Sequence, residues 1–122
     1  MDLRALLATE LLGELLDQAK FLNAEGHHVA AASLAGAVLE DALRRLCRAR
    51  GLSIPKRTDI ARLNAELAGA GAYDTPTQRR IATLAAISVR AHHGQFDKLR
   101  REDVEEMVKW VRRFAFHHLR KG

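Results

Sequence analysis

Apolar residues recur at three- and four-residue spacings along almost the whole chain, and only two prolines interrupt the pattern. This is the periodicity of helices that bury one face. The chain has 122 residues, 48% of them hydrophobic, which is enough to bury one core. The sequence therefore predicts a single all-α domain over residues 1–122, folded as an antiparallel four-to-five-helix bundle.

The first two helices are expected over residues 2–23 and from about His27 to Arg50, where Gly51 ends the second. Between them, Gly26 suits a left-handed C-terminal position. The small residues at 29–37 would let another helix approach closely, and Val38, Leu39, Leu43 and Leu46 would point inward. The inward stripe of the first helix is predicted to contain Leu3, Leu7, Leu11, Leu15, Ala19 and Leu22, widened by Leu12 and Leu16.

Three further helices follow a connector that contains Pro55. Thr58 or Asp59 caps a short helix that ends near residues 69–71. The next helix has Thr75 as its N-cap, Pro76 at the first helical position and a capping box. It ends at Gly94, and the last helix begins near Arg101. The expected inner faces are Ile81, Leu84, Ala85 and Ser88 for the fourth helix, and Val104, Met107, Val108, Val111, Phe114 and Ala115 for the fifth.

The charge balance is 20 Lys plus Arg against 15 Asp plus Glu, a formal net charge of +5. An excess of positive charge favours polyanionic partners such as RNA. The single cysteine, Cys47, excludes an internal disulfide, and no apolar run approaches the roughly 20 residues that span a bilayer. The first residues resemble neither a signal peptide nor a transit peptide. We therefore expect a cytoplasmic protein that does not insert into a membrane.

Two stretches of the sequence resemble HEPN-fold proteins. One is AAASLAGAVLEDALR at residues 30–44, and the other is AHHGQFD at residues 91–97. The second is followed by Glu102-Asp103-Val104 and by a last helix that ends in Arg112-Arg113-Phe114. The resemblance extends from about residue 15 to about residue 115.

The resemblance implies a bundle that commonly forms a homodimer, with the end of the penultimate helix at the interface. Active HEPN proteins are metal-independent endoribonucleases, so no metal and no cofactor is implied. Their motif is an arginine followed four to six positions later by a histidine. The histidine can move a proton at the ribose 2′-OH or at the leaving oxygen. The arginine can hold the phosphate and stabilise the charge that builds on it.

The chain departs from this motif at the arginine. When His93 is aligned with the motif histidine, the arginine position holds Ser88, which carries no positive charge. Arg90, one helical turn before His93, is the candidate substitute. Ser88 and His92, four residues apart, form a second candidate pair in which the serine is the nucleophile and the histidine the base. Cations that adjoin the motif are candidates for phosphate contacts: Lys98, Arg100 and Arg101.

Three functions are consistent with these residues. The first is a ribonuclease-like HEPN domain that uses His93 with Arg90. The second is a catalytically degenerate, dimeric HEPN module that binds RNA or a cognate partner protein. The third is a repurposed or redesigned bundle with a small-molecule pocket around Ser88, His92 and Trp110. Whether the protein is an enzyme is therefore open at the level of sequence.

Overall fold

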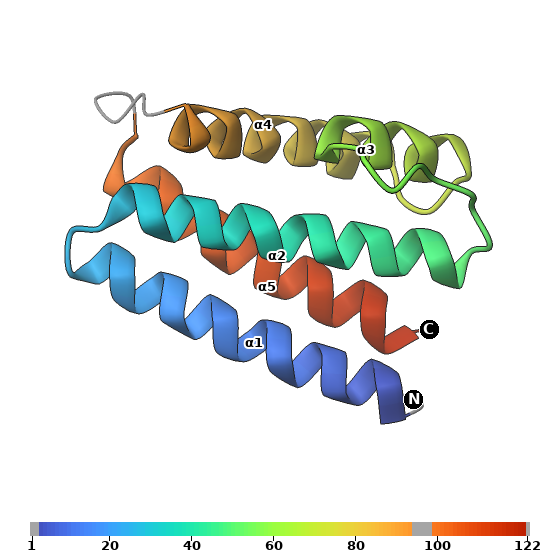
Figure 1. The fold of residues 1–122 in the computed structure, drawn as a ribbon, viewed down its shortest axis with the longest axis horizontal. Coiled ribbons are helices and arrows are strands. Elements are labelled where there is room, and N and C mark those ends of the chain that lie inside the picture. Colours follow the sequence, from blue (N-terminus) through green and yellow to red (C-terminus); the bar gives the residue numbers. More distant parts are fainter. Residues whose placement is uncertain (1–2, 94–98, 122) are drawn as a thin grey trace.

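The protein is described by a computed structural model that covers residues 3–93 and 99–121. Over these residues the chain forms five α-helices and no strand, as the all-α prediction expected (Figure 1). The helices are α1 (Leu3–Ala24), α2 (His28–Ala49), α3 (Ile60–Gly69), α4 (Thr75–His92) and α5 (Arg101–Lys121). None of them, in the part of the chain described, is long and apolar enough to cross a membrane.

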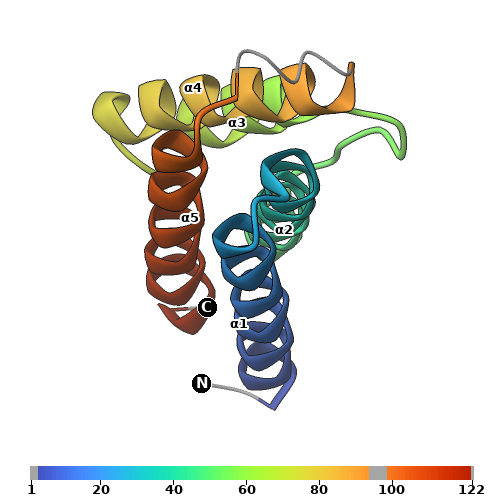
Figure 2. The same ribbon diagram turned by 90° about the vertical axis from the view of Figure 1, so that its left-hand side faces the viewer.

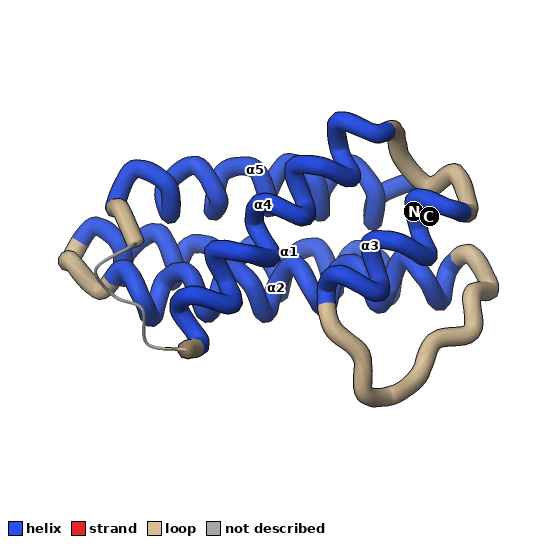
Figure 3. Tube along the Cα trace, turned by 90° about the horizontal axis from the view of Figure 1, so that it is seen from above, coloured by secondary structure: helices blue, strands red, loops and turns tan. Residues whose placement is uncertain are grey.

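Helix α2 lies at the centre of the bundle and packs against each of the other four helices. Seen end-on, α3 and α4 lie together at the top, and α1, α2 and α5 lie below them, with α5 beside the other two (Figure 2). From above, α4 runs obliquely over the helices beneath it (Figure 3). The first half of α2 can be approached closely because its inner residues are small. Buried residues of α2 include Ala31, Ala32, Ala35, Gly36, Leu39 and Leu43.

The starts and ends of the helices follow local capping chemistry. Asp59 caps α3 by accepting a hydrogen bond from the Arg62 N–H at 2.9 Å, which decides between the two predicted caps. Gly26 follows α1 with a φ of 89°, the left-handed conformation predicted for it. The N-cap of α4 was predicted wrongly, because it is Asp74 and not Thr75. The Asp74 carboxylate reaches the Thr77 N–H at 3.0 Å, so Thr75 is already inside the helix.

The predicted inward stripes of α2 and α5 are confirmed, but that of α1 is wrong in its first half. Leu3, Leu7 and Leu11 are 68%, 55% and 52% exposed, whereas Leu12 and Leu16 are 3% and 1% exposed. Helix α1 carries two neighbouring apolar stripes and packs chiefly against α2 and α5. Both partners lie on one side of α1, so only one stripe can be buried.

The inner face of α4 is wider than the prediction. Ile87 and Ala91 are buried together with the expected Ile81 and Leu84, while Ala85 is only half-buried. Helix α4 crosses α2 obliquely, and the crossing decides which residues point inward. The predicted end at Gly94 lies outside the described residues. Within them, α4 ends at His92, and His93 is its C-cap.

Candidate nucleic-acid interface at the end of α4

Ser88, which was predicted to stand at the position of the motif arginine, lies at the point where α4 crosses α2. A Cβ atom built on Gly36 would lie 2.3 Å from the Ser88 Oγ and 2.9 Å from its Cβ. Both distances are far below ordinary van der Waals contact. The Ser88 side chain therefore fills the space that a larger residue at position 36 would need, and it is half-buried.

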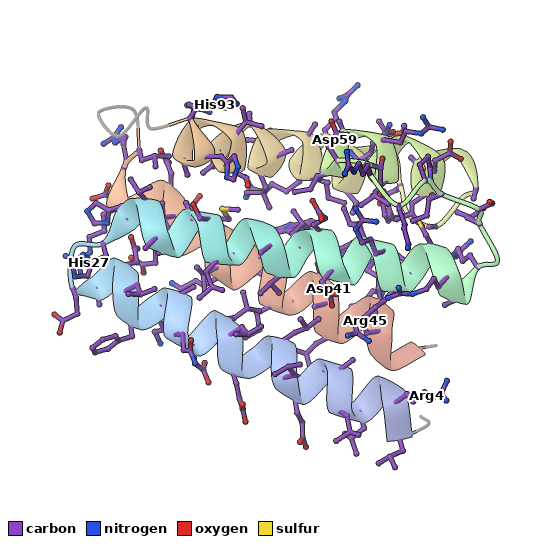
Figure 4. The ribbon with its side chains drawn as sticks, in the orientation of Figure 1. Arg4, His27, Asp41, Arg45, Asp59 and His93 are labelled. Atoms are coloured by element: carbon purple, nitrogen blue, oxygen red, sulfur yellow. The ribbon has the colours of Figure 1, made fainter. Side chains whose placement is uncertain are left out.

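His93 lies at the C-terminal end of α4 and is exposed, as is His92 (Figure 4). The His93 backbone N–H donates to the Val89 carbonyl at 3.0 Å, which closes the last turn of α4. The two imidazole rings lie edge to face with 6.3 Å between their centroids. Both rings are available to a ligand on the outside of the bundle.

Helical geometry separates Ser88 from His93. Residues five positions apart differ by about 140° around a helix, so these two side chains leave α4 on different sides. Arg90 and His93 are three positions apart and differ by only about 60°. Ser88 and His92 lie on nearly the same side, yet no hydrogen bond joins them in the described part of the chain. Ser88 therefore lies at the α2–α4 crossing, while Arg90 and His93 leave α4 at more similar angles.

Arg90 is half-buried and donates from its Nε to the Ala86 carbonyl of its own helix at 3.3 Å. It lines a groove of 180 Å³ between α4 and α5, together with Arg80, Asp103 and Glu106. No ion pair within 4.0 Å involves either arginine among the described residues. Two guanidinium groups and two carboxylates therefore face the same small groove.

Of the predicted phosphate contacts, Arg100 and Arg101 are exposed, and Lys98 lies outside the described residues. Arg101 does not line the same groove as Arg90. It lines a larger one between α1 and α5, with Lys20 and Arg113. Lys20 and Arg113 were not predicted as part of a site, because residues 93 positions apart give no local signal that they meet.

The outer surface of α4 is strongly cationic. Helix α4 contains three arginines and no acidic residue between Thr75 and His92. Arg79 and Arg80 are exposed, and neither takes part in an ion pair among the residues that the structure describes. Two of the three arginines of α2 differ, because Arg44 pairs with Glu40 at 3.3 Å and Arg45 with Asp41 at 2.6 Å.

The small-molecule pocket around Ser88, His92 and Trp110 gains no support from the cavities. The three grooves of 560, 180 and 630 Å³ are lined by other residues. Trp110 instead stacks on Phe114 of its own helix, with ring centroids 5.1 Å apart. Across the described residues, no three His, Cys, Asp or Glu side chains are placed to hold a metal ion together.

A second polar cluster lies where α3 meets α4. The Tyr73 hydroxyl donates to the Asn64 Oδ1 at 2.6 Å, and the Asn64 Nδ2 donates to the Gln78 carbonyl at 2.9 Å. Burial, and to a lesser extent nearby Cys47, raises the pKa of Tyr73, so its hydroxyl stays protonated and can donate. Burial likewise raises the pKa of the Cys47 thiol. This cluster joins two helices and presents no ionised nucleophile.

The fold and the histidines at the end of α4 define an all-helical bundle with a HEPN-like motif region. The chain belongs to the HEPN domain family, whose model matches residues 13–116. A search of curated proteins and a search of solved structures found no match. HEPN domains commonly dimerise, and membership of this family supports a ribonuclease-like or nucleotide-binding role for the module.

Proposed function

We propose that this protein is a catalytically degenerate HEPN module that binds RNA through the outer surface of α4 without cleaving it. The observation that carries the proposal is the position of Ser88. It replaces the motif arginine and lies at the crossing with Gly36. A serine hydroxyl there supplies no positive charge for a phosphate that is being cleaved.

Binding is supported by the charge of α4. Arg79 is exposed and forms no ion pair in the described structure, while His92 and His93 are exposed at the end of the helix. Each cation that neutralises a phosphate releases bound counterions from the RNA, so affinity for RNA should fall steeply with salt. Arg100 is exposed at the start of α5 and extends the same candidate contact region.

The test is fluorescence anisotropy with a labelled single-stranded RNA at salt concentrations from about 50 mM to about 200 mM. Replacing Arg79 by Gln should lower the slope of log affinity against log salt by roughly 0.7. Arg57→Gln is the matched control, because Arg57 is an exposed arginine in the connector between α2 and α3. Equal slopes for both variants and the parent protein would contradict RNA binding at α4.

A ribonuclease that uses Arg90 and His93 is the second candidate, and the observation that favours it is that both residues leave α4 within about 60° of each other. It is tested by incubating the protein with single-stranded RNA in EDTA, beside a His93→Ala variant. We expect no cleavage by either protein. Cleavage that is lost in His93→Ala and weakened at least tenfold in Arg90→Gln would replace our proposal with this one.

We further propose that the protein acts as a homodimer. A cognate partner protein is the alternative occupant of the same surface of α4. Support comes from the family and from Val89, which is 55% exposed on α4 beside the small exposed residues Ala82 and Ala86. Light scattering coupled to size-exclusion chromatography measures the mass directly. Val89→Glu should convert a dimer of this kind to a monomer, and a monomeric parent protein would refute it.

A further inference from the structure

The largest cation-rich groove lies away from α4, between the second half of α1 and the first half of α5. It has a volume of 560 Å³, within the range of small-molecule sites. Figure 2 shows α5 beside α1 and α2, below the layer of α3 and α4. Neither His92 nor His93 is among the residues that line this α1–α5 groove.

Five cationic and two acidic side chains line the α1–α5 groove. Both acids are already paired, since Asp17 accepts from Arg112 and Glu105 accepts from Lys109 at 3.2 Å. Each acid is therefore paired with one cation, Asp17 between α1 and α5 and Glu105 within α5. The groove keeps an excess of three positive charges.

The three cations that remain are Lys20 on α1 and Arg101 and Arg113 on α5. All three are exposed, and none takes part in an ion pair within the described residues. They come from both walls of the groove and from both ends of its α5 wall. An anion inside the groove could therefore be contacted from more than one side.

The other two grooves do not share this excess. The groove that contains Arg80 and Arg90 also contains two carboxylates, those of Asp103 and Glu106. In the third groove, Arg50 is the one Lys or Arg, and Asp74 offsets its charge. Among the three grooves, the α1–α5 groove is the one whose charge selects an anion.

The wall of the α1–α5 groove is held in place by a buried amide. Asn23 is 4% exposed, and its Nδ2 donates to the Arg101 carbonyl at 3.0 Å, which fixes the start of α5 against α1. His28 Nδ1 lies 2.7 Å from the Asn23 Oδ1 and orients the amide. Val108, 3% exposed, gives the groove an apolar floor. The cations therefore lie on two helices that the Asn23 hydrogen bond joins, next to the apolar side chain of Val108.

We propose that the α1–α5 groove binds a phosphomonoester, with the phosphate held by Lys20, Arg101 and Arg113 and the organic part placed over Val108. A phosphate dianion matches an excess of several positive charges better than a single carboxylate does. Guanidinium groups bind phosphate oxygens through paired hydrogen bonds. The phosphate can come from a free small molecule or from the 5′ end of an RNA strand, because the chemistry that contacts the groove is the same.

Isothermal titration calorimetry with phenyl phosphate, and with phenol as the uncharged analogue, tests the proposal on the full chain. We expect phenyl phosphate to bind and phenol to bind at least tenfold more weakly. Arg113→Gln should weaken phenyl phosphate binding by about tenfold, the effect of losing one charge-assisted hydrogen-bond donor. Arg57→Gln removes the same charge outside the groove and should change the affinity less than twofold.

A second measurement separates the two sources of phosphate. Labelled RNA with a 5′-phosphate is compared with the same RNA carrying a 5′-hydroxyl, in the parent protein and in Arg113→Gln. A preference for the 5′-phosphate that Arg113→Gln abolishes assigns the groove to RNA ends, and binding of phenyl phosphate alone assigns it to small molecules. The proposal is overturned if phenyl phosphate does not bind, or if it binds equally to the parent protein and Arg113→Gln. Neither result depends on Arg79, so the RNA surface of α4 can fail its test while the groove passes.

Discussion

Two pairs of helices meet across a glycine in this bundle, and the two contacts leave very different amounts of space. At the α2–α4 crossing, a Cβ on Gly36 would lie 2.3 Å from the Ser88 Oγ. At the α1–α5 contact, a Cβ on Gly13 would meet the Arg112 Nη1 at 3.8 Å and the Phe116 Cζ at 3.9 Å, which is ordinary contact. The Ser88 side chain closes the first contact, whereas the second has room for a methyl group.

The two contacts therefore differ in how well they tolerate a larger residue at the glycine. The tight α2–α4 crossing contains Ser88, so a change there alters the packing of the two helices. The α1–α5 contact has room at its surface and keeps its charges accessible. Matched substitutions in the two contacts test this contrast.

The largest effect on stability is expected in the buried apolar layer through which α1 packs against the rest of the bundle. Leu16 is 1% exposed, so Leu16→Ala removes a buried side chain and should lower the free energy of unfolding by about 3 kcal/mol. Leu11→Ala is the control on the same helix, since Leu11 is 52% exposed and should change stability by less than about 0.5 kcal/mol. Urea denaturation measures both. Equal losses would mean that the outer leucine stripe of α1 is also buried in solution.

The next effect is at the tight crossing. Gly36→Ala should lower the free energy of unfolding by about 1–2 kcal/mol, because overpacking outweighs the better helix propensity of alanine. Thermal unfolding should show a midpoint that falls by about 4 °C per kcal/mol.

Ser88→Gly provides the check on that explanation, since it removes the side chain that a Cβ at position 36 would meet. Combining it with Gly36→Ala should recover at least about 1 kcal/mol relative to the sum of the single changes. Strict additivity would show that the strain at Gly36 arises from another neighbour.

The same substitution at the looser contact should act in the opposite direction. Gly13→Ala gains helix propensity without a clash and should raise the free energy of unfolding by about 0.5–1 kcal/mol. Denaturation midpoints of Gly13→Ala and Gly36→Ala, measured side by side, should therefore lie on opposite sides of the parent protein. A destabilised Gly13→Ala would remove the contrast between the two helix contacts.

The smallest effect concerns the cap that starts α4 and so positions the tight crossing. Hydrogen bonds from Thr77, first from its side chain and then from its backbone N–H, lower the pKa of Asp74. A lowered folded-state pKa means that the contribution of Asp74 to stability is present above its ordinary pKa of 3.8 and is lost as the pH falls through the lowered value. Between pH 7 and pH 3, the parent protein should lose slightly more stability than Asp74→Asn, whose amide keeps the cap and does not titrate. Identical losses in urea titrations at the two pH values would show that ionisation of Asp74 does not contribute to stability.

Much of the fold was predictable because the signals that define it are local. The ion pairs of Glu40 with Arg44 and of Asp41 with Arg45, the Asp59 cap and the buried stripe of α5 follow from spacings within one or two helical turns. The cap of α4 was misassigned by one residue because Asp74 and Thr75 are adjacent and both are good capping residues. The inner side of α4 was predicted only in part, because Ile81, Leu84 and Ser88 face inward as expected while the burial of Ile87 and Ala91 depends on contacts with other helices.

The sequence by itself determined most of the helices and the resemblance to the HEPN family, since both depend on residues that are neighbours in the chain. Only the tertiary structure decided which leucine stripe of α1 is buried, because that depends on which helices lie beside it. It also decided that Ser88 meets Gly36, and that Lys20 of α1 shares a groove with Arg101 and Arg113 of α5. Residues this far apart in the chain are brought together by packing, which periodicity and local charge patterns do not record.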